Sequence, residues 1–123
     1  MANFDAVTAS NEPRIMSVYL DTVREIISKY TSSVSIVLEN DVLCIYGYDW
    51  FQMYAPFDED LDFLNEDISE DFFKEIAPYL AEPLIIHCVG SEKCRFPLSA
   101  MEITVTDGLI KYGGFAGNHE VEF

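Results

Sequence analysis

The chain has 123 residues, half of them hydrophobic, and its 22 acidic against 7 basic residues leave a formal net charge of −15 at pH 7. The length suits a single domain over residues 1–123, and seventeen aromatic residues argue against a disordered chain. Such an acidic protein repels nucleic acid and anionic membrane surfaces, and it attracts basic proteins and cations.

The predicted location is cytoplasmic. Residues 1–13 have neither a basic start nor an apolar run, and no stretch approaches the roughly twenty apolar residues that a membrane helix needs. The three cysteines, Cys44, Cys88 and Cys94, are odd in number and lack C-x-x-C spacing, which favours a reducing compartment. We therefore expect no membrane partner.

The first predicted element is an amphipathic helix that follows a polar lead-in over residues 1–11. Ser10 or Asn11 can cap it, Pro13 suits its first turn, and the pattern ends near Thr31. Its apolar residues recur at helical spacing and form a wide stripe suited to packing on a sheet: Ile15, Met16, Tyr19, Leu20, Val23, Ile26, Ile27 and Tyr30.

Strand patterns follow. Residues 34–38 and 42–48 flank a turn at Glu39-Asn40-Asp41 and predict a hairpin. Residues 49–57 continue the β composition, and Gly47 marks either a bulge or a turn between these runs. Pro56 and the acids after it end this part of the predicted sheet.

A second helix is expected after Asp67, which can cap it, with Glu70 completing a pair that resembles a capping box. Phe72, Phe73 and Ile76 begin its apolar face, and Pro78 ends it near Ile76. Residues 84–89 then form a nearly continuous apolar run, which predicts a buried central strand.

The last third of the chain carries the strongest hairpin signal. Asp107-Gly108 separates residues 102–106 from residues 109–112, and a two-residue loop places Val105 opposite Ile110 and Ile103 opposite Tyr112. Pro97 leaves residues 94–100 without a clear assignment, and residues 119–123 can add an edge strand.

The predicted fold class is therefore α+β. The element order is one helix, three β-runs, a second helix and three more β-runs. This order predicts a largely antiparallel sheet of about five or six strands, with both helices packed on one face. A doubly wound parallel sheet does not fit, because the strands do not alternate regularly with helices.

The charge is concentrated in the middle of the chain. Residues 30–92 hold fourteen acids and one base, and eight of the fourteen residues from Asp58 to Asp71 are acidic. Asp58-x-Asp60-x-Asp62 opens like a calcium-binding loop, but Phe63 and Ser69 stand where such a loop needs glycine and glutamate. We expect no metal and no cofactor, so this acidic stretch is either a solvated loop or a docking surface for a basic partner.

No catalytic motif stands out. His87, Cys88, Cys94 and His119 could pair a thiol with an imidazole base, but strand neighbours such as His87 and Cys88 point to opposite faces. Cysteine is more often a core residue, and zinc sites have a recognisable ligand spacing that is missing here. The sequence therefore predicts that the protein is not an enzyme.

The run from Tyr46 to Phe57 holds six aromatic residues. If the chain continues straight, Tyr46, Tyr48, Trp50, Gln52 and Tyr54 share one face, and Leu43, Ile45, Phe51 and Met53 share the core face. The first face suits a protein-binding surface, although the rings could equally cover the core from a second side. A tight turn at Tyr48-Asp49 would undo this assignment.

The leading functional hypothesis is a small acidic inhibitor that binds a basic protein, most concretely a bacterial toxin-immunity protein that neutralises a nuclease-like toxin. The alternatives are an inhibitor that mimics nucleic acid, a metal-binding or small-ligand domain or enzyme that uses the acidic cluster, and a scaffold whose charge serves only solubility. No direct binding of nucleic acid is expected. The candidate partner-binding residues combine the acidic and aromatic stretches: Asp58, Glu59, Asp60, Asp62, Glu66, Asp67, Glu70, Asp71, Tyr46, Tyr48, Trp50 and Tyr54.

Overall fold

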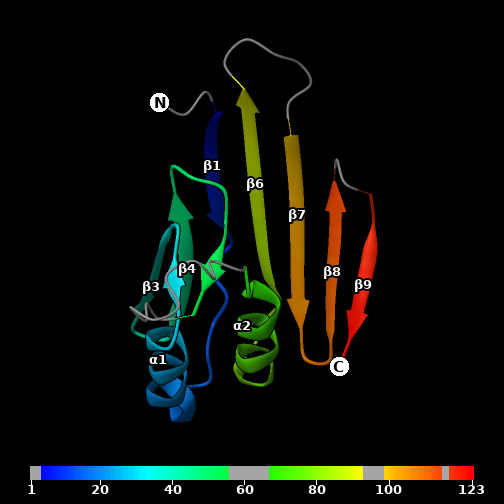
Figure 1. The fold of residues 1–123 in the computed structure, drawn as a ribbon. Helices are drawn as coiled ribbons and strands as arrows, with labels where there is room; N and C mark the ends of the chain where they lie inside the picture. Colours follow the sequence, from blue (N-terminus) through cyan, green and yellow to red (C-terminus); the bar gives the residue numbers. More distant parts are fainter. Residues whose placement is uncertain (1–3, 56–66, 93–98, 115–116) are drawn as a thin grey trace.

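The computed structural model describes residues 4–55, 67–92, 99–114 and 117–123, and within these ranges the chain is α+β, as predicted (Figure 1). A seven-stranded antiparallel sheet has the order β3-β4-β1-β6-β7-β8-β9. Its strands are β1 (Phe4–Ser10), β3 (Ser35–Glu39), β4 (Val42–Gly47), β6 (Leu84–Glu92), β7 (Ser99–Thr106), β8 (Leu109–Gly114) and β9 (His119–Glu122).

The remaining elements lie on the helix side of this sheet. The helices are α1 (Leu20–Ser28), which follows a 3-10 turn at Ser17–Tyr19, and α2 (Ser69–Ile76), which continues into a 3-10 turn at Ala77–Tyr79. β2 (Thr31–Ser32) and β5 (Met53–Tyr54) pair as a separate two-stranded sheet. No helix in the described ranges is long and apolar enough to cross a membrane.

The expected polar lead-in was wrong, because residues 4–10 form β1 in the middle of the sheet. β1 pairs with β6 along its whole length and with the end of β4. The strand looks polar in the sequence because its buried residues are small. Ala6 and Thr8 point into the core, and the Thr8 hydroxyl donates to the Asp49 carbonyl oxygen at 2.7 Å, which satisfies its polarity.

The first helix begins seven residues later than Pro13, where the sequence had placed its first turn. Residues 13–16 are extended and bonded to distant parts of the chain. The Ile15 N–H donates to the Asp41 carbonyl at 2.7 Å, and the Leu43 N–H donates to the Pro13 carbonyl at 3.0 Å. Ile15 is buried through this extended segment rather than through the helix.

The second helix ends as predicted, at Ile76 before Pro78. Its start differs in detail, since Ile68 occupies the N-cap position. The Asp67 carboxylate accepts hydrogen bonds from the Ser69 and Met53 N–H groups, both at 3.1 Å, and so ties the first turn of α2 to β5. The Glu70 side chain does not complete a capping box but pairs with Lys74 at 3.4 Å.

Both predicted hairpins are confirmed. β3 pairs with β4 across the turn at Asn40, which has a left-handed φ of 55°. In the second hairpin, Val105 lies opposite Ile110 and Ile103 lies opposite Tyr112, in the register that Asp107-Gly108 predicts. β6 is the middle strand of the sheet, and residues 119–122 form the expected edge strand β9.

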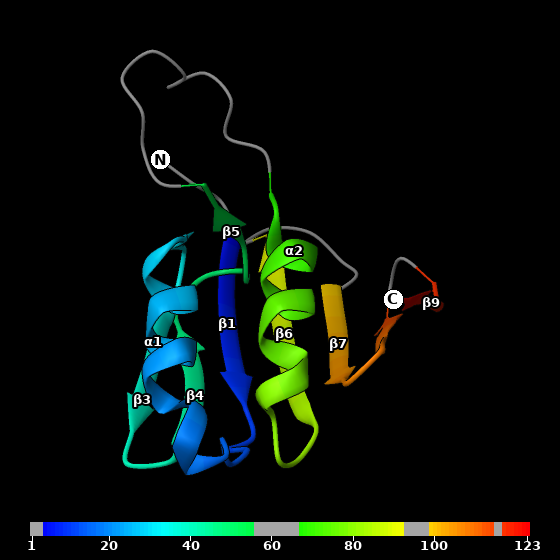
Figure 2. The same ribbon diagram turned by 90° about the horizontal axis from the view of Figure 1, so that it is seen from below.

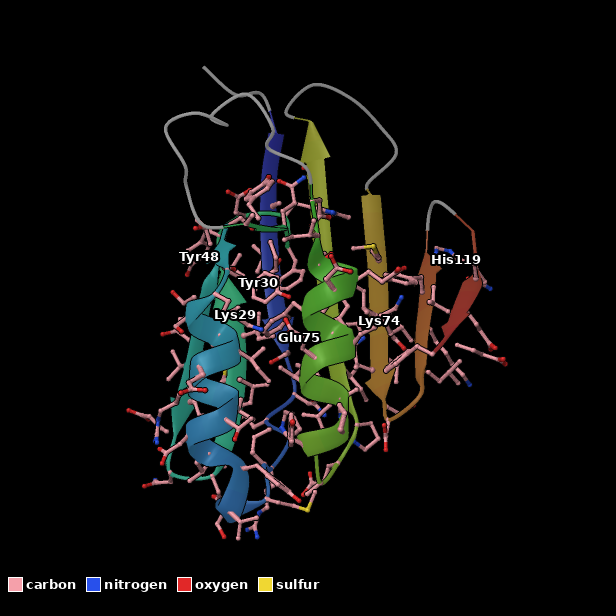
Figure 3. The ribbon with its side chains drawn as sticks, turned by 60° about the horizontal axis from the view of Figure 1, so that its bottom comes forward. Lys29, Tyr30, Tyr48, Lys74, Glu75 and His119 are labelled. Carbon is pink, nitrogen blue, oxygen red and sulfur yellow. The ribbon has the colours of Figure 1, made fainter. Side chains whose placement is uncertain are left out.

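The hydrophobic core fills the space between the sheet and the helices. Figure 2 shows α1 in front of β3 and β4 and α2 in front of β6, while β8 and β9 lie beyond α2. The rings of Phe51 and Phe73 stack with centroids 5.6 Å apart. The two helices are joined by Glu75 of α2, which accepts hydrogen bonds from Lys29 and Tyr30 at the end of α1 (Figure 3).

Candidate functional site

The candidate site is the face of the sheet that points away from the helices, which we call the open face. Strand register places its side chains in rows. One row runs across β4, β1, β6, β7 and β8 as Tyr46, Ala9, His87, Glu102 and Gly113. No other element in the described part of the chain packs on this face, so these side chains meet solvent.

The centre of the open face is apolar. Tyr46, Val7 and Val89 are 50%, 48% and 47% exposed, which is high for large apolar residues in the middle strands of a sheet. Val7 and Val89 are cross-strand partners, and Val89 also faces Ala100. Contiguous exposed apolar side chains of this kind mark interaction surfaces more often than scattered single ones do.

The rim of the open face is acidic. Strand alternation places Glu39 on the edge strand β3, and Glu120 and Glu122 on the edge strand β9, on this side. Glu102 on β7 points the same way but lies inside the sheet, opposite His87 of the middle strand β6. Lys111 on β8 lies opposite Glu120, and Arg14, which pairs with Val42 at the start of β4, is also exposed on this side of the sheet. The His87 Nε2 atom is 2.8 Å from the Glu102 Oε2 atom across β6 and β7.

Two hollows meet at Glu102 and Gly113, because the glycine adds no side chain to this row of the open face. The polar hollow has a volume of about 490 Å³, and its lining includes Thr104, Lys111, Asn118 and Glu120. The apolar hollow has a volume of about 410 Å³, and its lining includes His87, Val89, Ala100 and Gly114. The open face therefore has an apolar centre, an acidic rim and a depression between them.

The structure separates the aromatic residues that the sequence had grouped. Tyr46 lies on the open face, and Tyr48 is 94% exposed just beyond the end of β4. The chain does not continue straight, because it leaves the sheet after Gly47 and crosses to the helix side. Trp50 packs against the core there, and Tyr54 is partly buried in β5.

The predicted core face of the same run is confirmed, since Leu43, Ile45, Phe51 and Met53 are all buried. The condition for a shared aromatic face was a straight chain, and the bend at residues 48–49 removes it. The Thr8 hydroxyl holds the Asp49 carbonyl at this bend.

The predicted acidic residues divide in the same way. Asp67, Glu70 and Asp71 stand at the start of α2, on the opposite side of the sheet from Tyr46. Asp67 is bonded to the Met53 N–H next to Tyr54. Burial raises the pKa of Tyr54, and the charges of Asp67 and Asp49 raise it further. Asp58, Glu59, Asp60, Asp62 and Glu66 lie outside the described residues.

The structure separates the histidines and cysteines that could have paired a base with a thiol. His87 points to the open face and Cys88 into the core, with its sulfur 3.4 Å from the Thr8 hydroxyl. His119 stacks on the Tyr112 ring on the helix-facing side, with centroids 4.6 Å apart. Cys94 lies outside the described residues. In the described ranges, no three His, Cys, Asp or Glu side chains gather as metal ligands.

Val7, Val89 and Glu102 are the candidate residues that sequence reasoning missed. Glu102 follows the two-residue alternation of β7, but Val7 and Val89 had no local signal of exposure, because β1 looks polar and the run 84–89 is apolar almost throughout. The strand order was needed to bring the three together. Comparison with protein-family models, with curated proteins and with solved structures finds no match to this chain. A functional assignment therefore rests on the open face and on the charge of the chain.

Proposed function

We propose that the protein is a small acidic inhibitor that binds a basic protein through its open face. The observation that supports this is the combination of half-exposed Tyr46, Val7 and Val89 with an acidic rim. An apolar centre within a polar rim is the common anatomy of protein–protein interfaces. The concrete form that we propose is an immunity protein that neutralises a basic, nuclease-like toxin.

The net charge indicates which kind of protein binds the open face. A protein with a net charge of −15 repels a second copy of itself and other acidic proteins, but it attracts a basic surface over a distance of several ångströms. A nuclease active site carries cations that bind phosphate, and carboxylates can satisfy the same cations. The apolar centre then supplies the packed contacts that slow dissociation.

The test compares two substitutions that change the net charge equally. Val89→Lys places a cation in the centre of the open face, and Val18→Lys places one in the 3-10 turn before α1, where Val18 is 81% exposed. The partner is recovered by pull-down from the source cells, and the affinity of each variant is measured by surface plasmon resonance. Thermal melts confirm that both variants fold.

We expect Val89→Lys to weaken binding by about tenfold or more, as changes at a packed interface centre do. Val18→Lys should stay within about twofold of the parent protein, because a single exposed charge outside the interface is screened by salt. Equal weakening by both variants would contradict docking on the open face. It would instead favour an inhibitor that mimics nucleic acid, which binds through carboxylates without an apolar centre.

A further inference from the structure

We infer that the apolar hollow on the open face receives an arginine side chain of the basic partner, with Glu102 as its counter-charge. This inference rests on the proposed function for the source of the arginine. The hollow itself is a property of the chain and can be tested without the partner. Its residues are His87, Val89, Ala100, Glu102, Gly113 and Gly114.

The hollow is part of the fold, because two glycines form one side of it. Gly114 has φ of 132°, and a Cβ atom there would stand 2.1 Å from the Ala100 carbonyl oxygen. A Cβ atom on Gly113 would meet the Asn118 Oδ1 atom at 3.2 Å. No larger residue fits at Gly114 without a shift of the backbone, because β7 and β8 approach closely there. Gly113, which is paired with Glu102, adds no side chain to the open face, and this leaves the space beside Glu102.

Glu102 offers a carboxylate that is only partly engaged. Its Oε2 atom is bonded to His87, and its Oε1 atom has no partner in the described part of the chain. The side chains of His87 and Glu102 are 58% and 56% exposed, so a ligand can reach both of them. The imidazole holds the carboxylate in place at the border between the two hollows.

Arginine matches this arrangement better than other side chains do. Its planar guanidinium can donate two parallel hydrogen bonds to one carboxylate and can lie flat on an imidazole ring. Its aliphatic stem can cover the apolar floor made by Val89 and Ala100. Lysine has the same charge but lacks the planar pair of donors, so it can neither bind the Glu102 carboxylate through two parallel hydrogen bonds nor stack on His87.

The neighbouring polar hollow does not favour an anion instead. Lys111 is its only basic Lys or Arg side chain among the described residues, and Glu120 stands directly opposite on β9. With Glu102 on the shared border, the two hollows hold two carboxylates and one ammonium group. A cation is therefore the charge that this part of the face attracts.

The experiment is a titration of ¹⁵N-labelled protein followed by NMR. The probes are Nα-acetyl-arginine amide, Nα-acetyl-lysine amide and Nα-acetyl-citrulline amide at constant ionic strength. Citrulline has nearly the shape of arginine without its charge. We expect saturable shifts of the amides of His87, Glu102, Gly113 and Gly114 with arginine, binding at least about fivefold weaker with lysine, and none with citrulline.

Glu102→Gln tests the counter-charge and Glu39→Gln is its matched control. Both remove one acid from the open face, but Glu39 lies on β3 at the far edge, away from the hollow. Glu102→Gln should abolish the saturable shifts, and Glu39→Gln should leave the dissociation constant within about twofold. Loss in both variants would show attraction by overall charge only and would overturn the inference.

Other outcomes also decide the matter. Equal binding of arginine and lysine, or no saturable shift with arginine, would overturn the arginine assignment. These results are independent of the proposed function, because a partner can still dock on the open face and respond to Val89→Lys without placing an arginine here. Conversely, saturable binding of the arginine probe, together with failure to recover a basic partner, would support the arginine site and contradict the proposed function.

Discussion

At the scale of single residues, Thr8 is a buried polar side chain that is hydrogen-bonded to the bend after β4. It is 1% exposed in the middle of β1, and its hydroxyl donates to the Asp49 carbonyl at 2.7 Å. That carbonyl lies where the chain leaves β4 and crosses to the helix side. The bond therefore helps to decide that Tyr46 faces solvent while Trp50 packs on the core.

We expect Thr8→Val to lower the free energy of unfolding by about 1–2 kcal/mol, because it removes the partly buried hydrogen bond to the Asp49 carbonyl while keeping the side-chain shape. Urea melts measure this change. Thr104→Val is the control, since Thr104 is partly buried on the open face and its hydroxyl has no hydrogen bond in the described structure. Similar costs for both variants would mean that the bond to Asp49 does not stabilise the fold.

Gly114 carries the second prediction at this scale. Gly114→Ala should destabilise the protein by more than about 2 kcal/mol, because it adds a steric clash with the Ala100 carbonyl to an unfavourable φ. Gly117→Ala is the control, since Gly117 has φ of 92° but a Cβ atom there would meet no other atom within 4 Å. The difference between the two variants in urea melts isolates the clash, and an equal cost would contradict the close approach of β7 and β8.

At the scale of elements, Glu75 links the two helices. Burial alone raises the pKa of its carboxyl, but hydrogen bonds from Lys29 and Tyr30 and the charge of Lys29 outweigh burial and leave the pKa below its usual value of 4.5. Burial and the bond to Glu75 raise the pKa of Tyr30, so its hydroxyl keeps its proton at neutral pH. The carboxylate is thus stabilised in the folded state.

The consequence is a defined pH window. A carboxyl with a lowered folded-state pKa stabilises the fold above its unfolded pKa, and this stabilisation is lost as pH falls through the lower folded value. We expect Glu75→Gln to cost about 1 kcal/mol at pH 7, a figure kept small because the ion pair is partly exposed. The deficit relative to the parent protein should shrink as pH falls below 4.5. Urea melts at several pH values check this, and a deficit independent of pH would refute it.

The elements that were predictable from sequence are those specified by local chemistry. The turns at Asn40 and at Asp107-Gly108 set both hairpins, and Pro78 sets the end of α2. β1 was missed because its buried residues are small and one is polar, so only its long-range pairing with β6 makes it a strand. The early start assigned to the first helix failed for a related reason, since Ile15 fits the helical period but is bonded to Asp41.

The open face was predictable only in part. The exposure of Tyr46 follows from strand alternation next to the buried Ile45, but the sequence equally allowed its ring to cover the core. The exposure of Val89 did not follow, because the apolar run 84–89 indicated burial on both sides. Whether a second layer covers a central strand depends on the arrangement of the whole chain, and periodicity within one strand carries no information about it.

At the scale of the whole molecule, charge and apolar contact have different expected roles. The acids are concentrated in residues 30–92, whereas Tyr46, Val7 and Val89 on the open face are uncharged. Long-range attraction accelerates association and is screened by salt, while packed apolar contacts mainly set the rate of dissociation. The contributions of the acidic stretch and of the open face can therefore be distinguished by measuring the association and dissociation rates separately.

The last prediction concerns Asp58, Glu59, Asp60 and Asp62, which lie outside the described residues. Neutralising all four to the corresponding amides should lower the association rate with the basic partner at low salt and flatten its dependence on salt, because the Debye length is about 10 Å at 0.1 M. The dissociation rate should change little, and the melting temperature should stay the same or rise as like-charge repulsion is relieved.

The matched control neutralises four exposed acids spread over other parts of the chain: Glu12, Asp21, Glu25 and Asp107. Both variants have the same net charge, so a difference in association rate between them reports where the charge lies. Surface plasmon resonance at several salt concentrations gives both rates. If the variant of Asp58, Glu59, Asp60 and Asp62 associates as fast as the parent protein at low salt, the proposal that these acids steer association is wrong. Val89→Lys should act in the opposite way, with its main effect on the dissociation rate, because it disrupts the packed centre of the open face.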